Sequence, residues 1–167
     1  MRKKAALHNL GCKVNAYETE AMRQLLEEAG YEIVPFEPGA DVYVINTCTV
    51  TNIADRKSRQ MLHRARKMNP DAVVVATGCY VETADGAAKK DPAIDIVLGN
   101  NRKGELLTVL GEYEEHRREK EYKEAFTDKI DINHTKEYEN LQISRSEART
   151  RADIKVQDGC NQFCTYC

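Results

Sequence analysis

Apolar positions in residues 1–111 follow two patterns that alternate along the chain. Short continuous apolar runs are typical of strands buried on both faces of a sheet, whereas apolar residues three and four apart mark one face of a helix. The runs predict strands at 5–10, 31–36, 41–46, 72–77 and 94–98. Helical spacing predicts helices at 15–29, 52–68, 84–89 and 103–110. This order predicts an α/β, Rossmann-like fold with a mostly parallel sheet flanked by helices.

Two local signals refine this picture. Asn15 and Glu18 have the spacing of a capping box, which predicts that the first helix begins at Asn15, and Gly30 is expected to close it. Residues 35–40, between the second and third strands, are too few for an ordinary parallel crossover. Either a single helical turn connects these strands or they pair with other neighbours, so the strand order stays open.

Charge density separates the rest of the chain from this region. Half of residues 112–151 are charged and few are large and apolar, which predicts a linker, helical in its early part and extended later. Residues 152–158 alternate like a new strand. We therefore expect an α/β domain at 1–111, a charged linker at 112–151 and the start of a second, truncated domain at 152–167.

Composition excludes several classes of protein. None of the apolar runs in the 167 residues approaches the roughly 20 residues of a membrane span, and no secretory hydrophobic segment is visible. The net charge of -2 gives no global attraction for nucleic acid, so an RNA site must be local. Six cysteines without a secretory signal indicate metal ligands or reactive thiols in place of disulfides, and the expected location is the cytoplasm.

Three cysteines lie close together near residue 167. Cys160, Cys164 and Cys167 form a Cys-x3-Cys-x2-Cys loop, a spacing at which three thiolates can hold one soft metal centre. A structural zinc site requires a fourth ligand, whereas a 4Fe-4S cluster with three thiolates leaves one iron open to a small molecule. The loop therefore favours an iron–sulfur cluster, with zinc as the competing interpretation.

The other three cysteines are far apart in sequence but share a position. Cys12, Cys48 and Cys79 each follow the end of a predicted strand, and in a parallel sheet these ends meet at the edge where α/β folds bind ligands. Gly11 and Gly78 would let the backbone approach a bulky cofactor there. The alternative is that these cysteines are ordinary buried residues.

These motifs together resemble a known family. Gly11-Cys12-Lys13-Val14-Asn15, Asn46-Thr47-Cys48, Gly78-Cys79 and the loop at 160–167 are similar, in that order, to the methylthiotransferases, which are radical S-adenosylmethionine enzymes. The run 11–20 most resembles the bacterial branch that acts on N6-threonylcarbamoyladenosine next to the tRNA anticodon. Other branches act on isopentenyladenosine in tRNA or on a ribosomal protein.

The resemblance implies an activity and its cofactors. Cys12, Cys48 and Cys79 would hold an auxiliary 4Fe-4S cluster that delivers or carries the sulfur, and the 160–167 loop would hold the 4Fe-4S cluster that binds S-adenosylmethionine. The implied reaction adds a methylthio group at C2 of the modified adenosine. It requires a radical, because no ordinary side-chain base could remove the proton from that carbon. The implied partners are the tRNA anticodon loop and an electron donor such as a flavodoxin or ferredoxin, with no membrane. The family has a further barrel and RNA-binding domain, so we expect this chain to be inactive alone.

Weaker features leave alternatives open. The predicted helix at 52–68 is strongly basic and would either face an RNA backbone, contact the rest of the protein or form a solvated surface. His8, His63, His116 and His134 show no ligand spacing, and we assign them structural or solvent roles. Two other functions remain: a non-enzymatic iron–sulfur or zinc module, and an α/β binding domain whose cysteines belong to the core.

Overall fold

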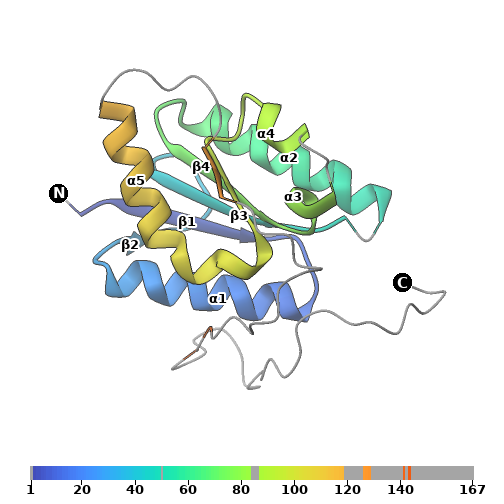
Figure 1. Ribbon diagram of the computed structural model, residues 1–167, viewed down its shortest axis with the longest axis horizontal. Helices are drawn as coiled ribbons and strands as arrows, with labels where there is room; N and C mark the ends of the chain where they lie inside the picture. Colours follow the sequence, from blue (N-terminus) through green and yellow to red (C-terminus); the bar gives the residue numbers. More distant parts are fainter. Residues whose placement is uncertain are drawn as a thin grey trace.

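The computed structural model describes residues 2–49, 51–83, 87–118 and 126–128, together with Leu141 and Ile143. It contains a six-stranded sheet with the order β2-β1-β3-β4-β5-β6, and every neighbouring pair is parallel (Figure 1). The strands are β1 (Lys4–Asn9), β2 (Glu32–Ile33), β3 (Val42–Thr47), β4 (Val73–Gly78), β5 (Ile96–Leu98) and β6 (Phe126–Asp128). The predicted α/β fold with a parallel sheet flanked by helices is confirmed.

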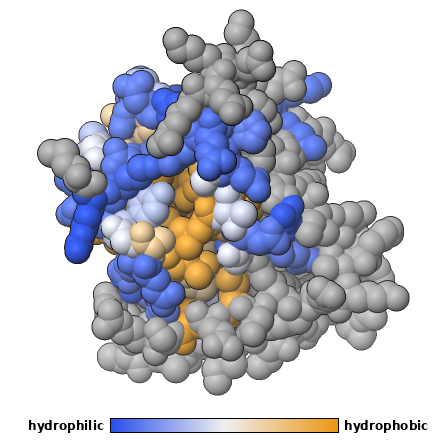
Figure 2. All heavy atoms as spheres, turned by 60° about the vertical axis from the view of Figure 1, so that its left-hand side comes forward, coloured by the Kyte–Doolittle hydropathy of each residue, from blue (hydrophilic) through white to orange (hydrophobic). Residues whose placement is uncertain are grey.

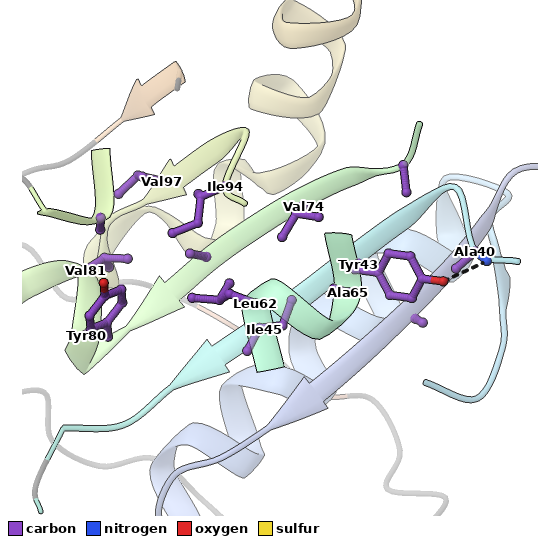
Figure 3. Packing of buried hydrophobic residues seen from close by; sticks show 14 residues of the cluster. Ala40, Tyr43, Ile45, Leu62, Ala65, Val74, Tyr80, Val81, Ile94 and Val97 are labelled. Carbon is purple, nitrogen blue, oxygen red and sulfur yellow. Dashed lines mark hydrogen bonds between the residues drawn. The ribbon is translucent and has the colours of Figure 1, made fainter. Parts of the chain in front are cut away.

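Helices cover both faces of the sheet. They are α1 (Lys13–Glu28), α2 (Asn52–Met68), α3 (Cys79–Thr83), α4 (Ala87–Lys90), the 3-10 helix η1 (Asn100–Glu105) and α5 (Leu106–Arg118). On one face, Leu62 and Ala65 of α2 pack with Tyr43, Ile45 and Val74 of the central strands (Figure 3). All six residues of β3 and all six of β4 are buried, as continuous apolar runs predict.

The second apolar layer lies under α1 and α5. Met22 and Leu26 of α1 and Leu106 of α5 pack against Val44 and Val75, whose side chains leave the sheet on the face opposite Tyr43 and Val74. Figure 2 shows an apolar area framed by hydrophilic residues on the side of the molecule that lies to the left in Figure 1. With helices on both faces, the sheet is the middle layer of three, and the loops lie at the ends of its strands.

The strand order explains the short connection between the second and third strands. β2 and β3 do not pair with each other, because β1 lies between them and pairs with both. The Tyr43 hydroxyl secures the connecting loop: it donates to the Glu37 carbonyl oxygen at 2.8 Å and accepts from the Ala40 N–H at 3.3 Å (Figure 3). Of the two interpretations left open, pairing with other neighbours is the one observed.

Several predicted boundaries need correction. α1 begins at Lys13 with Cys12 as its N-cap, so the capping box predicted at Asn15 is wrong. The helix expected at 84–89 is two short helices, α3 and α4, and the residues between them lie outside the described part. The helix expected at 103–110 is preceded by η1 and continues as α5 to Arg118. Gly30, with φ of 88°, follows the C-cap of α1 as predicted.

Parts of the expected linker are also described. α5 runs into it, Phe126–Asp128 pairs with β5, and Leu141 is buried with its carbonyl oxygen accepting from the Tyr17 hydroxyl at 2.8 Å. Apart from these residues and Ile143, positions 119–151 lie outside the described residues, as do all of 152–167 with Cys160, Cys164 and Cys167. Among the described helices, none is both long and apolar enough to span a membrane.

Candidate metal centre at the carboxyl edge of the sheet

Three cysteines meet where the central strands end. β1, β3 and β4 are neighbours in the sheet, and Asn46 is in register with Asn9 on one side and Thr77 on the other. Cys48 and Cys79 are the residues directly after β3 and β4. Cys12 follows the end of β1 and is the N-cap of α1. Because the chain leaves β1 toward β2 on one side while β3 lies on the other, this edge is also the point where α/β folds open a crevice.

The thiols are close enough to influence one another. Burial raises the pKa of the Cys79 thiol, Cys48 and Cys12 raise it further, and the nearby Lys103 ammonium lowers it. Cys48 is 8% exposed, whereas Cys12 is exposed. Within the described part of the chain, no three His, Cys, Asp or Glu side chains are placed as ligands of a single metal ion. Three converging thiols fit the donor set of an iron–sulfur cluster, in which each thiolate binds a different iron.

Asn15 positions Cys12 against the end of β3. The Cys12 thiol donates to Asn15 Oδ1 at 3.3 Å, and Asn15 Nδ2 donates at 3.0 Å both to Asn46 Oδ1 and to the Thr47 carbonyl oxygen. Asn46 Nδ2 donates in turn to the Asn15 carbonyl oxygen at 3.0 Å. This reciprocal pair of buried amides ties the first turn of α1 to β3.

Ser58 of α2 holds the backbone of Cys48. The Cys48 N–H donates to Ser58 Oγ at 3.1 Å, and Ser58 Oγ donates to the Cys48 carbonyl oxygen at 2.9 Å. Ser58 is fully buried, so both polar groups of Cys48 are satisfied without water. α2 therefore fixes the second cysteine, just as α1 fixes the first.

Gly78 brings the third cysteine close to β3. Gly78 has φ of 92°, and a Cβ there would overlap the Thr47 carbonyl oxygen. The Thr47 hydroxyl accepts from the Tyr80 N–H at 3.2 Å and donates to the Thr77 carbonyl oxygen. The glycine is thus required by the protein's own backbone, in addition to any approach of a cofactor.

A buried ion pair lies beside this edge. Lys103 of η1 is fully buried, and its Nζ lies 2.8 Å from Glu18 Oε2 of α1 and donates to Asn100 Oδ1 at 2.7 Å. The side chain of Thr77, also fully buried, has an Oγ1 without a hydrogen-bond partner among the described residues. Charged and polar groups therefore gather behind the cysteines in an otherwise apolar core.

The sequence analysis did not predict the contacts of the buried polar residues around the cysteines. Eight polar residues of the described part are buried, and all except Gln24 belong to the contacts above: Asn15, Glu18, Asn46, Thr47, Ser58, Thr77 and Lys103. The signal that could have found them is the polar residues that end the apolar strands, at Asn46-Thr47 and Thr77. The capping-box spacing assigns Glu18 to the start of the helix, whereas its carboxylate pairs with Lys103.

The histidines fit structural roles where they are described. The ring of His8 packs on Phe36 at 4.9 Å, His63 Nε2 lies 3.1 Å from Asp91 Oδ2, and His116 Nδ1 lies 2.7 Å from the Glu112 carbonyl oxygen. Burial lowers the pKa of His8, and Arg64 lowers it further. His134 lies outside the described residues.

Substitution of Gly78 tests the close approach of β3 and β4. We expect Gly78→Ala to destabilise the fold by more than the roughly 1–2 kcal/mol of a left-handed residue, because its Cβ also meets the Thr47 backbone. Gly30→Ala is a matched control, since Gly30 has φ of 88° but a methyl group there would have no atom within 4 Å. Urea unfolding of both variants measures the difference. Equal losses of stability would contradict the interpretation.

The chain matches known proteins along most of its length. Residues 4–99 match the family model described as "Uncharacterized protein family UPF0004". The chain is 48% identical over 162 residues to the threonylcarbamoyladenosine tRNA methylthiotransferase MtaB of Bacillus subtilis. This alignment covers 97% of the chain and 35% of that protein. The MtaB of Aquifex aeolicus is 44% identical, over 98% of the chain and 38% of that protein.

A relative with another named substrate is less similar. The tRNA-2-methylthio-N(6)-dimethylallyladenosine synthase of Moorella thermoacetica is 31% identical, over 99% of the chain and 37% of that protein. The chain thus spans little more than a third of the length of these relatives. The family model covers more than half of the chain and includes all three strand-end cysteines. The chain therefore belongs to the UPF0004 family, and over nearly its whole length it is similar to part of the MtaB proteins.

Proposed function

We propose that this chain is part of a tRNA methylthiotransferase that modifies N6-threonylcarbamoyladenosine next to the anticodon at C2. The observation that carries the proposal is the convergence of Cys12, Cys48 and Cys79 at one sheet edge, in a chain 48% identical to an MtaB. The higher identity to MtaB proteins than to the dimethylallyladenosine synthases favours the threonylcarbamoyl substrate.

Two sets of cysteines would hold the cofactors. Cys12, Cys48 and Cys79 would bind an auxiliary 4Fe-4S cluster, and Cys160, Cys164 and Cys167 would bind the 4Fe-4S cluster that takes S-adenosylmethionine. Together these cofactors supply the radical and sulfur chemistry that an adenine C–H bond requires. The proposed partners are tRNA and a reducing protein such as a flavodoxin or ferredoxin.

The described residues prepare the auxiliary site in defined ways. Asn15 and Ser58 fix Cys12 and the Cys48 backbone before any cofactor is bound, which reduces the ordering that ligation requires. Burial raises the pKa of the Cys79 thiol, and the Lys103 ammonium offsets part of that rise and so favours the thiolate, the form in which cysteine binds metal. The exposed Cys12 leaves the site open toward solvent.

Analysis of tRNA nucleosides tests the proposed function. Deletion of the gene is expected to abolish the 2-methylthio form of N6-threonylcarbamoyladenosine in digested tRNA, measured by mass spectrometry. The intact gene should restore it, and a copy with Cys48→Ala should not. Loss of the methylthio dimethylallyl nucleoside instead would assign the other substrate, and unchanged nucleosides in the deletion would reject the proposal.

A further inference from the structure

The outer face of α2 concentrates positive charge. The helix has one acidic residue, Asp55, and seven basic or histidine side chains: Arg56, Lys57, Arg59, His63, Arg64, Arg66 and Lys67. Three of the seven have acidic partners. Asp55 pairs with Arg59 at 3.0 Å, Asp91 lies 3.1 Å from His63, and Asp95 pairs with Arg66.

The other four cations have no such partner. Arg56, Lys57, Arg64 and Lys67 are exposed, and none makes an ion pair or side-chain hydrogen bond within the described ranges. In α1, by contrast, Arg23 is held between Glu20 and Glu27 at 2.6 and 2.7 Å. A solvated helix ordinarily intersperses charges of both signs, so the unpaired cations of α2 leave a local positive potential on a chain of net charge -2.

Three of these cations, Lys57, Arg64 and Lys67, line a groove that reaches the cysteine edge. The groove has a volume of about 550 Å³, and its lining includes Leu10, Lys57, Gln60, Met61, Arg64 and Lys67. Leu10 immediately precedes Gly11 and Cys12, so one end of the groove lies beside the candidate metal centre. A second hollow, lined by Arg56 and Arg59, shares Gln60 and His63 with it and extends the basic surface.

We propose that this groove, which we call the α2 groove, binds the backbone of a single-stranded RNA segment and thereby holds the tRNA beside the metal centre. The inference rests on the proposed function and deepens it by locating an RNA contact on this domain. Lys57 and Lys67 are ten residues apart, which is about 15 Å along a helix, so the cations can face successive phosphates. Leu10 and Met61 offer the apolar surface on which a base or ribose can lie between them.

An acidic protein is the competing occupant. A stable protein interface buries about 800 Å² on each partner and is dominated by anchors near its centre. The α2 groove instead combines cations with the apolar side chains of Leu10 and Met61, which suits the phosphates and nucleosides of RNA. The one large apolar side chain that the described part of α2 exposes, Ile53 at 64%, lies in the first turn of the helix and outside the groove lining.

The test compares two variants of the protein as encoded by its gene. Lys57→Gln/Arg64→Gln removes two cations from the α2 groove, and the matched control Arg2→Gln/Lys4→Gln removes two exposed cations near the amino end of β1. Affinity for an unmodified anticodon stem–loop is measured at several salt concentrations. Thermal melting and iron content are measured on the same samples, so that a folding or cofactor defect is recognised.

The proposal predicts that the groove variant binds the stem–loop roughly tenfold more weakly. The slope of log affinity against log salt concentration should become shallower by about 0.7 per lost phosphate contact. The control should bind within about twofold of the parent, and both variants should melt and load iron normally. Equal binding by all three proteins, or equal weakening of both variants, would overturn the inference. So would unchanged RNA binding with lost affinity for an acidic redox protein. Failure of the proposed function is read separately, from the nucleosides of the deletion strain.

Discussion

Replacement of Cys12, Cys48 and Cys79 together by alanine is expected to remove most of the iron and sulfide that the chain takes up under anaerobic reconstitution. The three thiols converge on one edge of an ordered sheet, and thiolates are the protein ligands of iron–sulfur clusters. Iron and sulfide analysis, with the absorbance of the reconstituted protein, measures the loss.

The second set of cysteines provides the matched control. A variant with alanine at positions 160, 164 and 167 also removes three thiols, yet it should retain the iron bound at the sheet edge. If the Cys12/Cys48/Cys79 variant bound as much iron as the parent, these residues would not be cluster ligands. Circular dichroism of the apo proteins establishes that each variant has kept the α/β fold.

The convergence of these cysteines could be predicted because it follows from local patterns and one general rule. Continuous apolar runs identified β3 and β4, and parallel strands have their carboxyl ends at one edge. The strand order could not be predicted in the same way, because apolar runs do not specify their neighbours. β2 is only two residues long and pairs with β1, and β1 also pairs with β3. The apolar pattern predicted β1 as a strand but not its position between β2 and β3.

The capping box shows where local signals fail. Asn15 and Glu18 have the right spacing, but both side chains have partners elsewhere in the fold: Asn15 bonds to Asn46 and Thr47, and Glu18 pairs with Lys103. These contacts join segments far apart in sequence, and no periodicity along the chain reveals them. Tertiary hydrogen bonds therefore determined the role of these residues, and the helix begins at Lys13 instead.

Lys103→Met is expected to destabilise the protein by about 3–5 kcal/mol, because it leaves the Glu18 carboxylate buried without its partner. The relative exposures of the two side chains are 1% for Lys103 and 6% for Glu18, so water cannot compensate for the lost charge. Thermal and urea unfolding measure the effect. For a chain of this length, the loss corresponds to a decrease in melting temperature of roughly 10 °C.

Two further variants identify the cause of this loss. Lys3→Met removes a lysine from the pair with Glu114, whose side chains are 49% and 25% exposed, and should cost less than about 1 kcal/mol. The double variant Lys103→Met/Glu18→Gln removes both buried charges and should recover part of the stability lost in the single variant, because no unpaired carboxylate remains. A Lys103→Met protein no less stable than Lys3→Met, or a double variant less stable than the single, would show that the pair is not buried as described. Recovery of stability in the double variant would mean that the fold can be stable without these two buried charges. Their retention beside Cys79 is then expected if Lys103 stabilises the Cys79 thiolate.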